Sequence, residues 1–463
     1  GTGELKPVTT AGVQILVTET GEFTIFNKDK HISSSTEQSG NKNVNIDLRR
    51  SERLKTLPVV SYDETEEDIN NYLMCAQSLN YKMPESYSDI KNRDDREQWE
   101  KAINDEINSL LINKTWSLVT KPLHKNIVDC KWVFTIKNDI FGNPNKYKAR
   151  LVARGFSQQH LVDYNETFAP VARISTFRIL VSFANNFSLL IHQMDVKTAF
   201  LNGLLREEIY MRVPDGIKAK ADQVCKLNKS LYGLKQSARC WFERFDIVLK
   251  EHNFKSSSVD RCLYCLDKGH IRENIYVLLY VDDLIIVTQN SVTMSNFKTY
   301  LMDKFQMVDL SELKLFLGIR IERNKNQITL DQSSFLKTVL NKFGMSNCKP
   351  VCTPLPSKLN YTALNMDETC DKPCRNLIGC LMYAMLCTRP DLCTAVNLLS
   401  RYQNKNNKEL WQCLKRLLRY IKGSLDLRLV YKRSTYNHIV IGFVDSDWGS
   451  NEIDRKSTTG YIF

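Results

Sequence analysis

Asp282 and Asp283 are adjacent acids set inside an apolar stretch of the chain, residues 275–287. Adjacent carboxylates repel each other unless a proton or a cation intervenes, so this pair favours a site for a hard divalent metal ion. The alternative is a plain β-hairpin whose turn uses aspartate for its backbone tolerance and local hydrogen bonds. A third acid, Asp195, follows the apolar residues 189–194 and would add a ligand from a separate segment of the chain.

The residues around these acids resemble those of a known family of enzymes. Residues 280–283 (Tyr-Val-Asp-Asp) and 195–200 (Asp-Val-Lys-Thr-Ala-Phe) are similar to the two metal-binding motifs of reverse transcriptases. Three more motifs, at 147–155, 166–171 and 230–236, narrow the resemblance to the Pol polyproteins of copia-type LTR retrotransposons. The resemblance implies an α+β fold, namely a right-hand polymerase with fingers, an antiparallel palm sheet and a thumb.

The activity implied by this resemblance is that of an RNA-directed DNA polymerase. Two Mg²⁺ ions, or Mn²⁺ in their place, would activate the primer 3′-hydroxyl and stabilise the leaving pyrophosphate. Asp195, Asp282 and Asp283 would be the catalytic residues and the metal ligands. The implied partners are an RNA template, a DNA or tRNA primer, dNTPs and other parts of the Pol polyprotein. The alternative is an inactive or domesticated nucleic-acid-binding remnant of the same fold, against which the intact acids argue.

The resemblance also implies a set of substrate-binding residues. Phe200 falls where an aromatic ring packs under the incoming sugar and excludes a 2′-hydroxyl, although an isolated aromatic residue more often belongs to a core. Basic residues of the two strands expected before residue 154 would clamp the triphosphate, and one sequence does not decide between Lys148 and Arg150. The alternative for each is a solvated basic face of a strand. The set comprises Lys137, Lys148, Arg150, Phe200, Tyr232, Gly233, Lys235 and Tyr280.

The sequence departs from the family just after the motif at 230–236. Ala238 stands where proline is common, and Cys240 stands where a small residue is common. These departures leave the detailed shape of this loop open but do not affect the predicted metal chemistry.

The elements that position these residues follow from the spacing of apolar side chains. From Trp99 onward, apolar positions recur at helical spacing, and shorter runs bounded by turn residues indicate strands. Strands are expected around the three acids and at 131–137 and 147–153, and helices at 177–187, 238–251, 297–305, 377–386 and 410–420.

Four regions are expected along the chain. The first is a polar linker with the tail of an integrase-side region, mostly disordered because its composition buries little apolar surface. The polymerase regions follow, and the last region is the truncated start of an RNase H-like domain. The linker covers residues 1–90, the fingers and palm 91–345, the thumb and connection helices 346–435, and the RNase H-like start 436–463.

Residues 442–448 resemble the first strand of the RNase H domain that follows such polymerases. Asp445 matches the first metal carboxylate of that domain, and the family's other acids lie farther downstream than Phe463. Since one carboxylate cannot hold two metal ions, cleavage of RNA in a hybrid is not expected. Two strands alone are also marginally stable, so rapid amide exchange is expected over this segment.

Composition narrows the class of protein. The formal charge of +12 and the sequence pI of about 8.9 are typical of a surface that meets phosphate, although solubility alone could account for them. No apolar run reaches the roughly 20 residues that cross a bilayer, so no membrane partner is expected, and we expect a cytoplasmic protein of virus-like particles whose complex enters the nucleus. The first residue is Gly1, which predicts a piece processed from a longer product.

Overall fold

The computed structural model describes residues 83–138, 144–366, 370–433, 441–449 and 455–463, together with the strands β1 (Gln14–Val17) and β2 (Phe23–Phe26). The chain divides into two compact units. The larger unit comprises residues 65–359 and 366–433, and the smaller comprises 1–64, 360–365 and 434–463. Most of the linker predicted over residues 1–90 lies outside the described residues.

A six-stranded antiparallel sheet carries the three acids. Its order is β10 (Lys255–Ser256), β11 (Leu263–Leu266), β12 (Ile275–Tyr280), β13 (Asp283–Thr288), β7 (Leu190–Val196) and β14 (Met307–Glu312). β12 and β13 form a hairpin, and β13 pairs on its other side with β7. The apolar runs of β12 and β13 are almost wholly buried, as expected for central strands, and the strands expected around the acids are confirmed.

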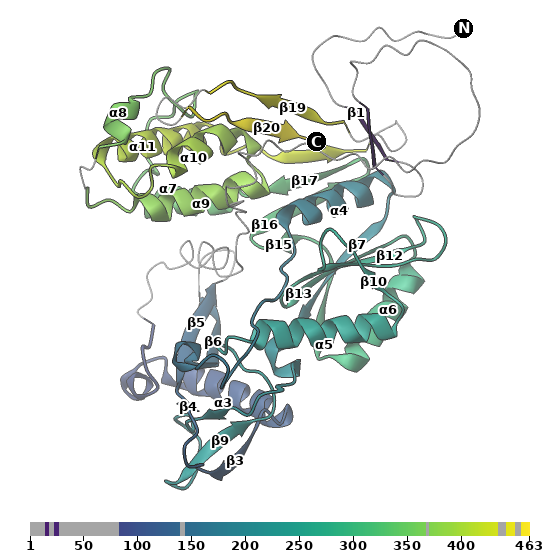
Figure 1. Cartoon of the computed structure of the whole chain (residues 1–463), viewed down its shortest axis with the longest axis vertical. Coiled ribbons are helices and arrows are strands. Elements are labelled where there is room, and N and C mark those ends of the chain that lie inside the picture. The colour runs from purple at the N-terminus through teal and green to yellow at the C-terminus, as the bar shows by residue number, and fades with distance from the viewer. Residues whose placement is uncertain are drawn as a thin grey trace. The chain divides into compact units, whose positions relative to one another are not determined.

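Helices α4 (Ile174–Asn186), α5 (Ser237–Glu251) and α6 (Ser291–Lys304) cover the two faces of this sheet (Figure 1). On one face, Phe245 of α5 contacts Tyr264, with ring centroids 6.1 Å apart. On the other face, Phe183 of α4 contacts Tyr276 at 5.1 Å. The apolar stripes of these helices therefore bury the sheet from both sides.

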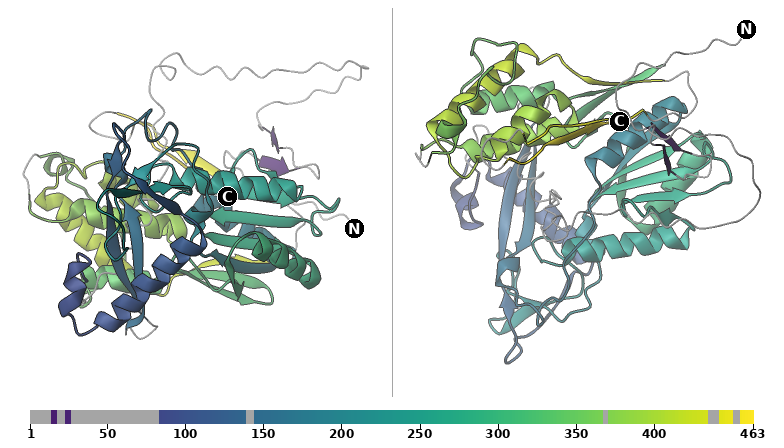
Figure 2. Two further views of the ribbon diagram at one scale, coloured as in Figure 1. Left: turned by 90° about the horizontal axis from the view of Figure 1, so that it is seen from below. Right: turned by 45° about the horizontal axis from the view of Figure 1, so that its top comes forward.

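Strands β5 (Cys130–Asn138) and β6 (Pro144–Ala153) form a long antiparallel ribbon, visible in Figure 2. Helix α3 (Arg96–Ile112) packs against it through Trp99, whose ring lies 5.2 Å from Phe134 and 4.7 Å from Tyr147. These are the two strands and the first helix that the sequence predicts, so that prediction is confirmed. A smaller sheet continues this region, in the order β3 (Trp116–Thr120), β9 (Gln223–Leu227), β8 (Tyr210–Met211) and β4 (Ile127–Val128).

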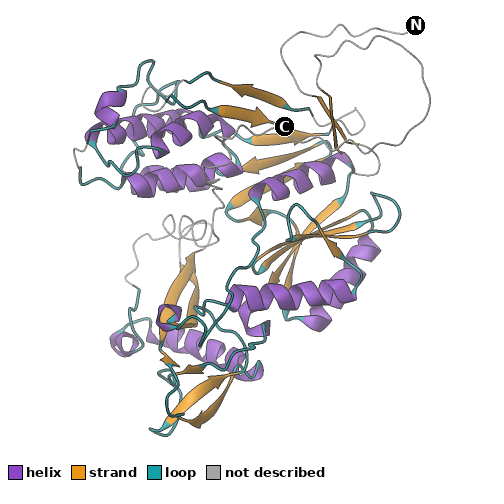
Figure 3. Cartoon of the chain, viewed as in Figure 1, coloured by secondary structure: helices purple, strands orange, loops and turns teal. Residues whose placement is uncertain are grey.

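The rest of the larger unit combines a second sheet with a group of helices. The sheet has the order β15 (Leu315–Phe316), β16 (Ile319–Asn324), β17 (Gln327–Asp331) and β18 (Leu429–Lys432). Pairing of β17 with β18 joins segments on either side of the boundary expected at residue 345. The helices are α7 (Ser333–Lys342), α9 (Cys374–Cys387), α10 (Cys393–Ser400) and α11 (Lys408–Gly423), which gather beside this sheet in Figure 3.

In the smaller unit, β19 (Phe443–Ser446) and β20 (Thr459–Ile462) form an antiparallel pair in which Asp445 lies opposite Gly460. The side chains of both strands are exposed. The strand expected at residues 442–448 is confirmed, while the RNase H role predicted for Asp445 stays a prediction.

Candidate active site

The three acids lie at one end of the six-stranded sheet. Val281 and Asp282 form the two-residue turn between β12 and β13, and Asp283 is the first residue of β13. In the β13–β7 pairing, Asp283 lies directly opposite Asp195. The amide of Val196 donates to the carbonyl oxygen of Asp282 at 2.8 Å, which fastens the turn to β7. The sequence placed these acids on a hairpin and a separate strand, and pairing of the strands brings them together.

Asp282 and Asp195 interact electrostatically. Burial raises the pKa of the Asp282 carboxyl, and the charge of Asp195 raises it further, while Arg150 and Lys148 act in the opposite direction. A half-buried pair of like charges is relieved when a cation lies between them. These two carboxylates therefore fit a hard divalent metal ion, which prefers oxygen ligands.

Asp283 is held differently from the other two acids. Its Oδ1 accepts a hydrogen bond of 2.8 Å from Nε2 of Gln193, which lies on the same face of β7 as Asp195. Within the described part of the chain, no three His, Cys, Asp or Glu side chains are gathered as a metal-binding group. The structure thus brings Asp195 and Asp282 together and engages Asp283 with an amide. Its role as a third metal ligand stays a prediction.

Two aromatic rings and a guanidinium form a surface next to the acids. Phe200, in the short 3-10 helix η3 (Ala199–Asn202), meets Tyr232 edge to face with ring centroids 4.8 Å apart. The guanidinium of Arg150 lies over the Tyr232 ring, 5.3 Å from its centroid. Burial raises the pKa of the Tyr232 hydroxyl, with Asp282 and Asp195 among the charges that add to the shift. Phe200 is partly exposed, so it contributes to this surface and is not a buried core residue.

Lys148 and Arg150 lie two residues apart on β6 and therefore point to the same face of the ribbon. Both lower the pKa of Asp282, and Arg150 has the larger effect. The Nε of Arg150 is buried and has no hydrogen-bond partner among the residues that the structure describes. Arg150 is therefore the better placed of the two to bind a phosphate near the acids. Lys137 lies on β5 opposite Lys146, and its side chain is outside the described part.

The remaining predicted substrate residues have other contacts. The ammonium group of Lys235 lies over the ring of Tyr164, 5.0 Å from its centroid. Tyr280 is buried, and its ring meets Phe316 edge to face at 5.8 Å. The structure thus places the Tyr280 ring in the core beneath the hairpin.

Gly233 has a structural reason to be glycine. Its φ is +87°, in the region that favours glycine, and a Cβ there would collide with the carbonyl oxygen of Ala153. A Cβ on Gly155 would collide in turn with the carbonyl oxygen of Gly233. This close approach allows the amide of Ala153 to donate to the carbonyl oxygen of Tyr232 at 2.7 Å. The two glycines thereby hold Tyr232 against β6, next to Arg150.

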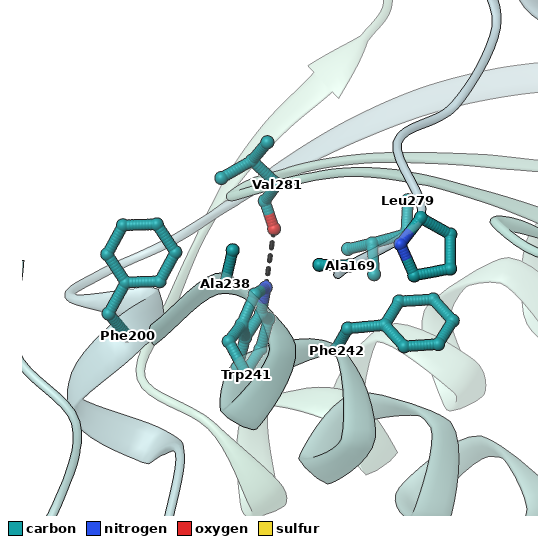
Figure 4. Close-up of a pocket in the computed structure, with 8 residues that line it drawn as sticks. Ala169, Phe200, Ala238, Trp241, Phe242, Leu279 and Val281 are labelled. Atoms are coloured by element: carbon teal, nitrogen blue, oxygen red, sulfur yellow. Dashed lines mark hydrogen bonds between the residues drawn. The ribbon is translucent and has the colours of Figure 1, made fainter. Parts of the chain in front are cut away.

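Sequence reasoning missed the contacts made by Gly155, Gln193 and Trp241. Gly155 ends the motif at 147–155 and could have been noticed there. Trp241 lies in the helix expected at 238–251, and its Nε1 donates to the carbonyl oxygen of Val281 at 2.6 Å (Figure 4), a contact that helical spacing does not reveal. Gln193 carries no local signal, because its partner Asp283 is distant in the sequence.

The site therefore combines an acidic hairpin turn with basic residues and an aromatic pair. This combination suits a phosphate substrate that is bound through a metal ion. Residues 113–357 match the family described as reverse transcriptase (RNA-dependent DNA polymerase), and the chain belongs to this family. The resemblance to copia-type Pol polyproteins is confirmed by the relatives described next.

The chain is similar to retrovirus-related Pol polyproteins of plant transposons. It is 38% identical over 428 residues to that of transposon TNT 1-94 of Nicotiana tabacum, covering 90% of this chain and 31% of the relative. It is 37% identical over 374 residues to that of transposon RE2 of Arabidopsis thaliana, covering 80% and 25%. The chain therefore spans between a quarter and a third of the length of these relatives.

Among solved structures, a foamy viral protease-reverse transcriptase in complex with double-stranded DNA aligns with a TM-score of 0.36 and 12% identity, over 72% of this chain and 48% of that one. A likeness of this size supports no statement about the fold. In the part of the chain that the structure describes, no helix is both long enough and apolar enough to cross a membrane.

Proposed function

We propose that this chain is an RNA-directed DNA polymerase that adds dNTPs to the 3′-hydroxyl of a primer paired with an RNA template. The observation that carries the proposal is the meeting of Asp195 and Asp282 beside the surface formed by Arg150, Tyr232 and Phe200. Membership of the reverse transcriptase family supports it.

In this proposal, the elements take the parts of a right hand. The β5–β6 ribbon with α3 is the fingers, the six-stranded sheet with α4, α5 and α6 is the palm, and α9, α10 and α11 belong to the thumb and connection. The position of the acids at a partly exposed hairpin turn of the central sheet supports this assignment, since a metal-bound substrate must reach them. The partners would be an RNA template, a DNA or tRNA primer, dNTPs and other parts of a Pol polyprotein, in a cytoplasmic virus-like particle.

The chemistry divides between the acids and their neighbours. Two Mg²⁺ ions, when bound, would activate the primer hydroxyl and stabilise the leaving pyrophosphate. Asp195 and Asp282 would hold them, with Asp283 as the third ligand. Arg150 would bind the triphosphate, because a guanidinium suits planar recognition of phosphate oxygens. Phe200 and Tyr232 would pack against the sugar and exclude a 2′-hydroxyl.

The test is extension of a labelled DNA primer on an RNA template by the purified chain, with each dNTP and with Mg²⁺, Mn²⁺ or EDTA. We expect extension with either metal ion and none with EDTA. Binding of the template–primer without any extension would favour the inactive nucleic-acid-binding remnant instead.

A further inference from the structure

The turn that carries Asp282 has a residue poorly suited to its backbone conformation. Val281 has a φ of +55°, whereas Asp282, the next residue, is not among the residues with positive φ. A positive φ at the first central residue alone is the pattern of a type II′ hairpin turn, where glycine is favoured. For a β-branched residue this conformation is a strained outlier, so the surrounding structure must hold it in place.

Both carbonyl groups of the turn are fastened from outside the hairpin. The carbonyl oxygen of Asp282 accepts from the amide of Val196 on β7 at 2.8 Å. The carbonyl oxygen of Val281 accepts from the indole nitrogen of Trp241 on α5 at 2.6 Å. Figure 4 shows the indole nitrogen directed at this carbonyl, with Phe200 on one side of the ring.

The indole ring of Trp241 is itself rigidly held. The residue is 1% exposed, and its ring contacts Phe245 at 5.5 Å and Phe305 edge to face at 5.2 Å. Phe305 follows directly after α6, so two helices fix the ring. Because the indole N–H group is fixed, it can hold the carbonyl group that it binds in one position. A solvent-exposed donor would move with that carbonyl group.

We propose that Trp241 is a positioning residue that clamps the strained turn and thereby holds the Asp282 carboxylate at its working distance from Asp195. The proposal rests on the function proposed above, because the clamped carboxylates are the ones that would bind the metal ions. The N–H group of Trp241 donates to the carbonyl oxygen of Val281 and to neither acid, so the proposed effect on Asp282 is transmitted through the turn.

The clamp makes a prediction about a second substitution. Glycine adopts a positive φ without strain, so Val281→Gly removes the need for the clamp. Trp241→Phe, which keeps an aromatic ring but loses the donor, should therefore damage the wild-type turn and spare the turn of the Val281→Gly variant. A role in core packing alone would cause equal damage in both backgrounds.

The experiment measures single-nucleotide primer extension by the wild type, Trp241→Phe, Val281→Gly and the double variant. In the wild-type background, Trp241→Phe should lower kcat about tenfold, as expected for the loss of one buried hydrogen bond, with little change in the KM for dNTP. In the Val281→Gly background the same substitution should lower kcat less than about twofold, which is within ordinary additivity error. Trp411→Phe is the matched control, because Trp411 lies on α11 and contacts Phe343 at 6.4 Å.

Amide exchange in the metal-free protein gives a readout that does not depend on activity. The Val196 amide, which donates to the turn, should exchange faster in Trp241→Phe and return to its wild-type rate in the double variant. Since phenylalanine is smaller and leaves a gap, thermal unfolding is followed for each variant. If Trp241→Phe does not fold, β-(3-benzothienyl)alanine at this position keeps the bicyclic ring and removes only the donor.

Equal loss of kcat in both backgrounds, or unchanged exchange at Val196, would overturn the clamp. If the wild-type chain extends no primer, the proposed polymerase function fails, and exchange at Val196 still decides whether Trp241 holds the turn.

Discussion

Replacing Arg150 with alanine tests the proposal that this residue binds the triphosphate of a dNTP. The guanidinium lies 5.3 Å from the centroid of the Tyr232 ring and lowers the pKa of Asp282 more than Lys148 does. Its Nε is buried and has no hydrogen-bond partner within the described residues. A phosphate oxygen would therefore accept the hydrogen bond that this N–H group can donate. On the basis of these contacts, we propose that Arg150 rather than Lys148 has the main phosphate role.

The size of the effect follows from the interactions that would be lost. A hydrogen bond to a charged group contributes about 1.5–3 kcal/mol, and a cation–π contact about 0.5–1 kcal/mol. Their sum of about 2–4 kcal/mol corresponds to a loss of roughly 30- to 1000-fold in kcat/KM for dNTP. Arg150→Lys should recover only part of this loss, because an ammonium group keeps the charge but not the planar fork.

The assay is steady-state incorporation of one dNTP on an RNA template, with template–primer binding measured separately. Lys148→Ala is the matched comparison. We expect its kcat/KM for dNTP to fall less than about tenfold, which is the effect of losing one hydrogen bond between uncharged groups. A larger loss for Lys148→Ala than for Arg150→Ala would refute the assignment.

Three other predictions follow from individual contacts. Phe200→Val should admit ribonucleotides, shifting dNTP over rNTP discrimination by about 1–3 kcal/mol in competition assays, and unchanged discrimination would place Phe200 outside the sugar contact. Ala238→Pro, in the first turn of α5, should raise the free energy of unfolding by about 0.4–1 kcal/mol in denaturant titrations, and a loss of stability would show that the ring does not fit there. Arg389 is 1% exposed and binds Asp391 with Nη2–Oδ2 at 2.7 Å, so Arg389→Met should cost about 3 kcal/mol in the same titrations. Burial raises the pKa of Asp391, but the hydrogen bond and charge of Arg389, together with the hydrogen bond from the Tyr420 hydroxyl, hold it below its ordinary value of 3.8. The stability from this pairing is therefore present above that pH and lost as the pH falls through the folded pKa. An Arg389→Met variant with the same acid dependence as the wild type would contradict the pairing.

The acids and their strands could be predicted from the sequence because their signals are local. Two apolar runs flanking Asp282 and Asp283 determine a hairpin, and an apolar run before Asp195 determines a strand end. The helices and the β5–β6 ribbon follow from the same kind of pattern. The family motifs then predicted which residues would bind the substrate.

The contacts that position these residues could not be predicted in the same way. Trp241 and Val281 lie 40 residues apart, and only the packing of α5 beneath the hairpin brings the indole to the carbonyl. The positive φ of Val281 goes against the preference of a β-branched residue, so local reasoning leads away from it. The backbone contact between Gly155 and Gly233 likewise depends on two loops meeting in space. Such features are set by tertiary packing, which overrides local propensity.

The most direct test of the account is the rate of a single dNTP addition by Asp282→Asn compared with the wild type. Loss of one metal ligand should cost at least about 3 kcal/mol of transition-state stabilisation, so the rate should fall by more than about 100-fold while template–primer binding is kept. Asp303→Asn, an exposed acid on α6, is the control and should match the wild type. Extension by Asp282→Asn at the wild-type rate would contradict the assignment of the hairpin acids as the catalytic centre.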